Sequence, residues 1–465
     1  MNFNSFDFVV FLAGTWVVYR AVYGWRGPRM GWLLAASAFF YGFWEPWYLL
    51  LVAASILLQY VVGGRLAASE DPRRRKRLLV FGIVGDLSLL GVFKYGNFTL
   101  ESVEAGLALA GVHAALPRVP TDLPIGISFY TFHSLSYIID LYRRRVAPAR
   151  GLLDLSVYVL FFPQLVAGPI TRASYFLPQL ERGPVTPPEN LGGSLFLILC
   201  GLVKKMVLAD TLATYVVTPY FAAPAGHPGW ETLLTMWAAN FQVYCDFSGY
   251  SDVALGAAML FGFTLPQNFD RPFQSLTPME HWRRWHITLG TWLRDYLYVP
   301  LGGSQRGPLR TDFNLIVTFL LGGLWHGAGW TFVIWGLYNG LVLVVWRRWA
   351  RPLSRLPKLV QAFLTFNTIC LGLVFLHAHS FADAWTALAS FGNLSLADTG
   401  LFTPPALGMF AVAVALHFTP RSWKDTLRAA FMEAPAWGVA SATMVTGAVL
   451  SLFAAMASPF FYFQF

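Results

Sequence analysis

The stretch Leu320-Leu-Gly-Gly-Leu-Trp-His-Gly-Ala-Gly-Trp330 places one histidine, His326, in the middle of a long apolar segment. No charged side chain occurs between Phe313 and Trp346, which suits the segment to the membrane interior. A titratable group at that depth is costly and points to a function. The surrounding glycines allow another backbone or a ligand to approach closely, and they loosen the helix. A simple hydrogen bond to a neighbouring helix would explain the histidine equally well.

The composition of the whole chain is that of a polytopic membrane protein. Of the 465 residues, 56% are hydrophobic and 12% are charged, whereas an average soluble domain has about 25% charged residues. The mean hydropathy is +0.52. The three cysteines are scattered among apolar residues, so neither a disulfide framework nor a thiolate metal site is expected. The net charge of +9 is interpreted first as loop charge that fixes the topology.

Apolar runs long enough to cross or enter a bilayer recur along the chain. Several are shorter than the roughly 20 residues of a full span and are cut by Gly or Pro, so some are expected to be re-entrant. We predict an all-α polytopic membrane protein with about 11 transmembrane helices plus re-entrant or interfacial helices around a central tunnel. A single integral domain covers residues 1–465, with N-terminal helices (1–145), a core with re-entrant segments (146–350) and C-terminal helices (351–465). The apolar runs lie near residues 5–23, 31–44, 46–63, 78–95, 124–142, 152–170, 191–218, 230–262, 312–346, 358–380, 404–418 and 436–457.

Clusters of basic residues set the expected orientation. Placing the Arg73–Arg77 run and the later arginine clusters in the cytoplasm puts both termini outside. Asp312 and Arg347 then both fall on the cytoplasmic side, so residues 313–346 should enter the membrane and return, with His326 near the deepest point. The first apolar run lacks a basic flank and is expected to be a retained helix. Lys204-Lys205 interrupts the run 191–218, which suggests a bent helix whose lysines reach an interface.

The longest polar connection, residues 266–312, alternates Trp and Arg as an interfacial amphipathic helix does. On that interpretation, Trp282, Trp285 and Trp292 lie at the membrane surface. His286 lies within this connection, a short distance in sequence before His326.

Three aspartates occur in apolar surroundings. Asp246 and Asp252 are six residues apart on an expected helix, so at most one of them faces a given site. Asp210 follows the Lys204-Lys205 pair. For each of them, a structural ion pair or a helix end is the alternative to a functional role.

Seven motifs give the chain a resemblance to the membrane-bound O-acyltransferase family. The resemblance covers essentially the whole chain and is strongest to the branch of bacterial alginate O-acetyltransferases, with the D-alanyl transferase of teichoic acid modification more distant. The motifs are Val166-Ala-Gly-Pro-Ile-Thr-Arg172, Asp246-Phe-Ser-Gly-Tyr-Ser-Asp252, Asn268-Phe-Asp-Arg-Pro272, Arg283-Arg-Trp-His-Ile287, Leu293-Arg-Asp-Tyr-Leu-Tyr-Val-Pro-Leu-Gly-Gly303, Gly323-Leu-Trp-His-Gly327 and Phe461-Tyr-Phe-Gln-Phe465.

The resemblance implies that His326 is the catalytic histidine and that His286 holds the second functional position. It implies supporting or substrate-binding roles for a further set of residues, and no metal. His281 departs from the pattern, because this branch usually has an aromatic residue there. The supporting set comprises Asp210, Asp246, Asp252, Asn268, Arg283, Arg284, Arg294, Trp325 and Gln464.

Physical chemistry and the resemblance agree on the reaction. O-acyl transfer needs a base to remove the acceptor proton and a group to stabilise the oxyanion. A histidine among apolar residues stays neutral and can act as that base. His326 is therefore the expected general base, and His286 is expected to position the donor thioester or to assist proton transfer; a covalent acyl-histidine stays open. Arg283, Arg284 and Arg294 either contact the phosphates of an acyl-coenzyme A or serve only as cytoplasmic positive charge.

The expected partners follow from the same resemblance. No bound cofactor is expected, and acetyl-coenzyme A is the expected donor substrate. The acceptor is expected to be an exported polysaccharide or a periplasmic serine-hydrolase-like acetyltransferase, with the chain in a bacterial inner membrane and no nucleic acid involved. Two other classes remain open: a transporter of acyl groups, whose broken helices would look similar, and a scaffold without catalysis of its own.

Overall fold

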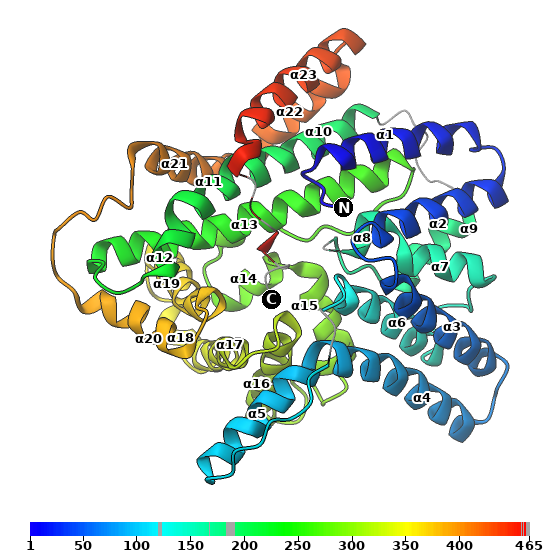
Figure 1. Ribbon diagram of the computed structural model, residues 1–465, viewed down its shortest axis with the longest axis horizontal. Coiled ribbons are helices and arrows are strands. Elements are labelled where there is room, and N and C mark those ends of the chain that lie inside the picture. Colours follow the sequence, from blue (N-terminus) through cyan, green and yellow to red (C-terminus); the bar gives the residue numbers. More distant parts are fainter. Residues whose placement is uncertain (120–122, 167, 183–190, 457, 459, 462–465) are drawn as a thin grey trace. The chain divides into compact units, whose positions relative to one another are not determined.

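A computed structural model describes residues 1–119, 123–166, 168–182, 191–456, 458 and 460–461 (Figure 1). Within these residues every regular element is a helix, and six helical segments are long and apolar enough to span a membrane. The predicted class, an all-α polytopic membrane protein, is therefore confirmed, whereas the number of spans and the tunnel stay predictions. The six segments are Tyr48–Ala67, Pro72–Leu109, Leu191–Ala222, Trp330–Arg348, Lys358–His377 and Ala436–Met456, with Pro404–Phe418 a shorter apolar helix.

The chain divides into two compact units. The first comprises Met1–Glu189 and Ala257–Pro266, and the second comprises Asn190–Gly256 and Gln267–Phe465. The three-part division of a single domain that the sequence suggested stays a prediction. Both histidines that the sequence singled out belong to the second unit.

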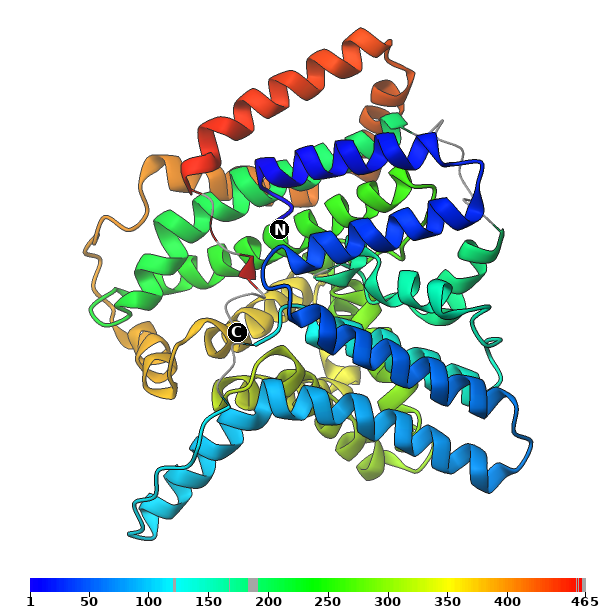
Figure 2. The same ribbon diagram turned by 45° about the vertical axis from the view of Figure 1, so that its right-hand side comes forward.

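The first unit is built around three helices that pack on one another, α3, α4 and α6, and Figure 2 shows α3 and α4 side by side. Its elements are α1 (Phe6–Ala21), α2 (Arg26–Gly42), α3 (Tyr48–Ala67), α4 (Pro72–Leu90), the π-helical η1 (Gly91–Tyr95), α5 (Gly96–Leu109), α6 (Ile127–Tyr142), α7 (Leu152–Leu160), α8 (Phe162–Leu165) and α9 (Ala173–Arg182).

Polar side chains inside this unit satisfy one another. Asp86 on α4 accepts hydrogen bonds from Ser55 (2.8 Å) and Gln59 (2.7 Å) on α3. Arg75, from the basic run that opens α4, is buried and donates to the carbonyls of Leu66 (2.7 Å) and Tyr142 (3.0 Å). Free carbonyls at helix ends need such donors. One arginine of this run therefore joins the ends of α3 and α6 instead of serving only as loop charge.

The second unit contains the long helix α13 and a helical hairpin made of α16 and α17. Figure 1 shows the two hairpin helices side by side, joined by a short turn. The elements are α10 (Leu191–Leu202), the π-helical η3 (Val203–Ala209), α11 (Asp210–Leu212), the π-helical η4 (Ala213–Val217), α12 (Thr218–Ala222), α13 (Gly229–Leu260), η5 (Pro272–Gln274), α14 (Pro278–Arg284), α15 (Ile287–Leu293), the π-helical η6 (Arg294–Tyr298), α16 (Pro308–His326), α17 (Trp330–Arg348), α18 (Ala350–Leu353), α19 (Lys358–His377), α20 (Phe381–Ala389), η7 (Ser390–Gly392), α21 (Pro404–Phe418), α22 (Arg421–Glu433), α23 (Ala436–Phe453) and η8 (Ala454–Met456).

The hairpin forms because its two backbones meet at glycines. A Cβ atom on Gly323 would lie 2.3 Å from the carbonyl oxygen of Phe332, and one on Gly336 would lie 2.5 Å from that of Phe319. Small residues at helix crossings let membrane helices approach in this way. At the open end, the Asp312 carboxylate accepts hydrogen bonds from Arg347 (2.6 Å) and Arg348 (2.9 Å). Both ends of this segment therefore lie together, as a segment that enters and returns requires, and its entry into the membrane stays a prediction.

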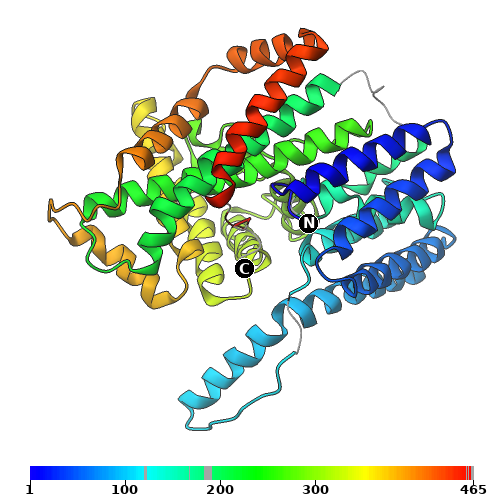
Figure 3. The ribbon, with the colours of Figure 1, turned by 45° about the horizontal axis from the view of Figure 1, so that its top comes forward.

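Helices from the end of the chain complete the second unit. Figure 3 shows α22 and α23, orange and red, beside α10, and both helices contact α10. Most residues of α23 are exposed, which suits a helix that faces lipid.

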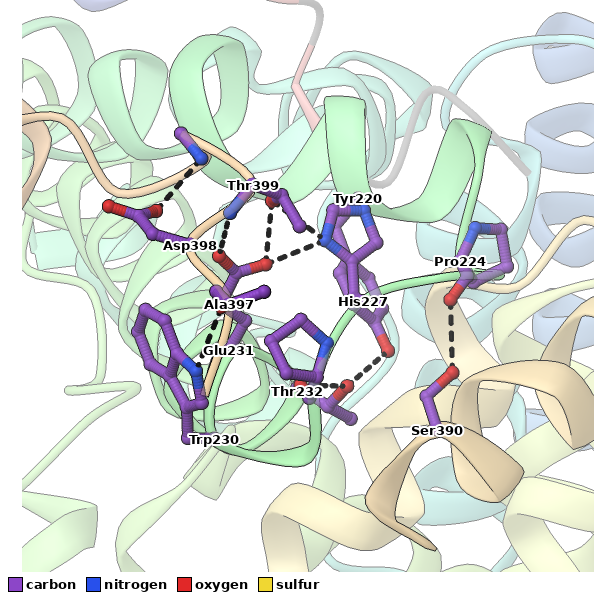
Figure 4. Close-up of polar contacts among 12 residues, drawn as sticks. Tyr220, Pro224, His227, Trp230, Glu231, Thr232, Ser390, Ala397, Asp398 and Thr399 are labelled. Carbon is purple, nitrogen blue, oxygen red and sulfur yellow. Dashed lines mark hydrogen bonds and ion pairs between the residues drawn. The ribbon is translucent and has the colours of Figure 1, made fainter. Parts of the chain in front are cut away.

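A loop between α20 and α21 is tied to the start of α13 by a buried carboxylate (Figure 4). Glu231 accepts hydrogen bonds from the backbone N–H of Thr399 (2.8 Å) and from its hydroxyl (2.7 Å), and it pairs with Nδ1 of His227 at 2.8 Å. Ser390 donates to the carbonyl of Pro224 (3.0 Å) nearby. These contacts fix one end of α13, the helix that carries Asp246 and Phe247.

Replacing Gly336 by alanine is expected to destabilise the protein by about 1–3 kcal/mol, because the added methyl group would strike a backbone carbonyl that cannot rotate away. Thermal unfolding in detergent measures the effect. Gly447→Ala on α23, where nothing lies within 4 Å of the added atom, is the matched control and should melt at or slightly above the wild-type temperature. Equal melting temperatures for the two variants would contradict the close contact.

Candidate active site

His326 lies at the closed end of the hairpin, where it is the last residue of α16. The chain turns at once through Gly327, where a Cβ atom would lie 2.3 Å from the ring of Phe332. The imidazole is buried and packs edge-on against Trp325 (ring centroids 5.0 Å) and Trp335 (4.9 Å). The hairpin therefore holds the ring in a fixed aromatic setting.

His286 lies between α14 and α15 in a left-handed backbone conformation, with φ 41° and ψ 53°. This conformation costs a residue other than glycine roughly 1–2 kcal/mol, and such strain is concentrated at functional sites. Asn268 holds the following residues in place. Its carbonyl accepts from the N–H of Ile287 (2.9 Å), and its side-chain oxygen accepts from the hydroxyl of Thr288 (2.9 Å). The sequence predicted a supporting role for Asn268, and this clamp is a structural basis for one.

The two histidines lie near each other. Their ring centroids are 6.3 Å apart, and Trp325 contacts both rings. On its other side His286 packs edge-on against Phe247 of α13 at 4.6 Å. Burial lowers the pKa of His286 well below its ordinary value, and the neighbouring His326 lowers it further. A neutral imidazole that accepts a proton is therefore favoured at this position.

A small cavity of about 20 Å³ opens beside His326. This volume holds one group about the size of a water molecule. Polar side chains at its wall are Asn240, Asn339 and His281, and the remainder is aromatic and aliphatic. The other lining residues are Val243, Trp282, Trp285, Trp335, Ile369, Leu373 and Leu376.

The three aspartates do not form one group. Asp210 and Asp246 both pair with Lys205, each at 2.7 Å, whereas Asp252 pairs with Lys204 at 2.6 Å. The expectation that Asp246 and Asp252 face different surroundings agrees with this arrangement. The prediction that both lysines reach an interface is wrong for Lys205, whose side chain is only 2% exposed. The cause is that Lys205 pairs with two buried aspartates, one of which, Asp210, meets it across the π-helical segment η3.

The arginines expected near the donor lie on the surface of this region. Arg284 pairs with Glu280 at 2.6 Å, Arg294 pairs with Asp295 at 2.7 Å, and Arg283 is exposed. Their proposed contacts with phosphates stay predictions, as do the roles of the other supporting residues. Gln464 lies outside the described residues.

The interfacial interpretation of the tryptophans is wrong for two of them. Trp285 and Trp292 are each only 7% exposed. Trp285 packs against Phe269 (5.2 Å) and Phe273 (6.1 Å) from the preceding loop. Only Trp282 keeps partial exposure, and it contacts Trp335 of the hairpin at 5.8 Å. The connection is folded into the unit because its aromatic residues pack on one another.

The residues that line the cavity beside His326 were not predicted from the sequence. Asn240, Asn339 and Trp335 occur on α13 and α17 without any motif of their own. His281 was noted only as a departure from the family pattern. Its ring stacks on Trp285 at 5.7 Å, so it takes the place of an aromatic residue in packing.

The helical fold of the described residues, with His326 at a hairpin tip near His286, defines a class of membrane protein, and comparison with known proteins identifies the family. The profile of the MBOAT, membrane-bound O-acyltransferase family, matches residues 131–381. The chain belongs to this family, whose name defines it by acyl transfer to oxygen, and the predicted membership is therefore confirmed.

Relatives include three bacterial enzymes. A probable alginate O-acetylase of Azotobacter vinelandii is 41% identical over 69% of this chain and 64% of its own length. A probable alginate O-acetylase of Pseudomonas putida is 36% identical over 84% of each chain. A peptidoglycan O-acetyltransferase of Helicobacter pylori is 34% identical over 79% of this chain and 74% of its own length.

Replacing Asn268 by alanine is expected to loosen the segment around His286, because the N–H and hydroxyl of Thr288 lose their acceptor. Leaving such groups unpaired costs about 1–3 kcal/mol. Hydrogen exchange of residues 286–290 and thermal unfolding measure the change. Gln267→Ala, at the exposed neighbouring position, is the control. Unaltered exchange in Asn268→Ala would show that the clamp does not hold His286.

Proposed function

We propose that this protein transfers an acyl group, most simply acetyl, from a cytoplasmic coenzyme A thioester to a hydroxyl group presented from the other side of a bacterial inner membrane. The observation that carries the proposal is the buried pair His326 and His286, with ring centroids 6.3 Å apart and a small cavity next to His326. The relatives named as O-acetylases and O-acetyltransferases support the same reaction.

His326 acts as the general base. It removes the proton of the acceptor hydroxyl as the oxygen attacks the thioester carbonyl, and the C–S bond then breaks to release coenzyme A as the thiol after it regains a proton. An imidazole held between two aromatic side chains is suited to this task, because it is kept in one position. Exclusion of water by the aromatic walls would also prevent hydrolysis of the donor.

The ring of His286 lies 6.3 Å from that of His326 and belongs to a separate element. We assign it to the donor side, where it positions the thioester or passes a proton to the leaving sulfur. The exposed Arg283 and the partly exposed Arg284 lie just before it in sequence and provide positive charge for phosphates of the donor. Attack by a histidine on the thioester, giving a transient acyl-histidine, is the variant of this mechanism that rapid-quench mass spectrometry would detect.

The acceptor is an exported polysaccharide or the hydroxyl of a periplasmic transferase. Alginate and peptidoglycan, which the names of relatives contain, are the first candidates. A carrier that moves acyl groups without breaking the thioester, or a scaffold, predicts no release of free coenzyme A by the purified protein.

Replacing His326 by alanine is expected to lower the rate of acyl transfer by about 10²–10⁴-fold, the usual contribution of a general base. The assay follows the release of free coenzyme A from acetyl-coenzyme A by protein purified in detergent. His286→Ala is expected to lower the rate as well. His417→Ala, which removes another buried imidazole, should retain activity. Wild-type rates in correctly folded His326→Ala would refute the proposal.

The size of the cavity beside His326 predicts preference for a short acyl chain. Leu373→Ala removes bulk from its wall, so the variant is expected to use propionyl- and butyryl-coenzyme A better relative to acetyl-coenzyme A. Leu371→Ala, on the same helix but 39% exposed, is the matched control. An unchanged ratio of kcat/KM between donors would show that the acyl group binds elsewhere.

A further inference from the structure

A buried cluster of one lysine and two aspartates holds the C-terminal tail of the chain. The ammonium of Lys205 lies 2.7 Å from Asp210 and 2.7 Å from Asp246, and it donates a hydrogen bond to the backbone carbonyl of Ser458 at 3.1 Å. The ammonium therefore donates hydrogen bonds to Asp210 and Ser458 and forms an ion pair with Asp246. The side chains of both aspartates are fully buried.

The tail also binds both carboxylates of the cluster. The hydroxyl of Ser458 donates to Asp210 at 2.6 Å, and the backbone N–H of Phe461 donates to Asp246 at 2.8 Å. The cluster contains one ammonium and two carboxylates, so it carries an excess of negative charge. The Ser458 hydroxyl and the Phe461 N–H stabilise this charge by donating hydrogen bonds to the carboxylates. Each charged member of the cluster therefore contacts the tail directly.

The local backbone is adapted to build this cluster. Lys205 and Asp210 are five residues apart, and in an α-helix that spacing would separate them by about 140° around the axis. The intervening segment is the π-helix η3, in which residues five apart are joined by the backbone hydrogen bond. The two side chains consequently meet on one face. Short π-helical segments occur often at functional sites.

Two aromatic contacts lead from the tail to the histidine pair. Phe460 stacks on Tyr250 of α13, with ring centroids 4.2 Å apart, and it packs edge-on against Phe247 at 5.8 Å. Phe247 in turn packs edge-on against His286 at 4.6 Å. Asp246 and Phe247 are adjacent in sequence. The helix that anchors the tail through Asp246 thus contacts His286 through the next residue.

We propose that the cluster of Lys205, Asp210 and Asp246 is a positioning device for catalysis: it fixes the tail residues Ser458, Phe460 and Phe461 against α13 and thereby sets the position of Phe247 and His286. This inference rests on the proposed function. Stability alone accounts poorly for the cluster, because replacing a buried ionic triad with apolar side chains is often neutral or stabilising. A defined position of the tail is what these directional contacts provide.

The neighbouring pair Lys204–Asp252 is a matched control. It has the same chemistry and lies one residue away in sequence, but its side chains are 24% and 18% exposed. Its ion pair joins the same two helical segments. A variant of Lys204 therefore removes a lysine–aspartate pair between η3 and α13 but leaves the hydrogen bonds that hold the tail unchanged.

The experiment compares Asp246→Ala, Asp246→Asn and Lys204→Met in the full-length protein in detergent. Exchange of the Phe461 amide, measured on the C-terminal peptic peptide, reports the tail, and release of coenzyme A from acetyl-coenzyme A reports kcat and KM. Asp246→Ala is expected to expose the amide to exchange and to lower kcat by about 10²-fold, the usual effect of a misplaced catalytic group, with little change in KM. Asp246→Asn keeps an acceptor for Phe461 and should recover part of both losses. Lys204→Met should match the wild type in both.

Two results would overturn the inference: fast exchange with a normal kcat in Asp246→Ala, or a reduced kcat while the amide stays protected. Ser458→Ala, which leaves the charges paired, keeps the test decisive if Asp246→Ala does not fold. It should produce faster exchange and a smaller loss of kcat, and wild-type values of both would also overturn the inference. The proposed function is tested separately by His326→Ala. If His326→Ala is inactive while Asp246→Ala shows fast exchange of the Phe461 amide and a normal kcat, only the positioning role is refuted and the proposed function stands.

Discussion

The close contact between the backbones of α16 and α17 is the constraint on which the candidate site depends. Because Gly323 and Gly336 carry no side chains, the two helices meet directly and the turn between them is short. Asp312 closes the other end by pairing with Arg347 and Arg348. His326 is consequently held at the tip of a rigid hairpin. Any residue that separated the helices would move the imidazole away from Trp335, which forms one wall of the cavity.

Buried polar residues in this chain fall into two kinds. Some satisfy one another, as membrane proteins require of groups that cannot reach water; Asp86 with Ser55 and Gln59 is one example. The two histidines form the second kind, because their rings also pack edge-on against the aromatic side chains of Phe247, Trp325 and Trp335. A general base needs an imidazole that is held in a fixed position next to the reacting group. We therefore assign a structural role to buried polar residues such as Asp86, and a chemical role to the two histidines.

The sequence predicted features that depend on a continuous stretch of residues. It did not predict the direction of side chains that depends on helix register or on packing between separate elements. A window without charges, bounded by Asp312 and Arg347, was enough to predict a segment that enters and returns with His326 inside it. The burial of Lys205 could not be predicted, because its partner Asp210 reaches the same face only through a π-helical segment, which shifts the side chains that follow it. The burial of Trp285 was also missed, since a Trp and Arg alternation looks the same whether its aromatic residues face lipid or Phe269 and Phe273. Asn240 and Asn339 reach the cavity only through the packing of separate helices.

The most direct test of the central claim is the position of a bound donor. A cryo-electron microscopy structure with a non-hydrolysable thioether analogue of acetyl-coenzyme A would show where the reacting carbonyl lies. The account predicts that the carbonyl carbon occupies the space between His326 and His286, close enough for a hydroxyl oxygen about 3–3.5 Å away to contact the imidazole of His326. An analogue whose acyl group lies outside this space, with His326 shielded from it by Trp325 or Trp335, would contradict the account.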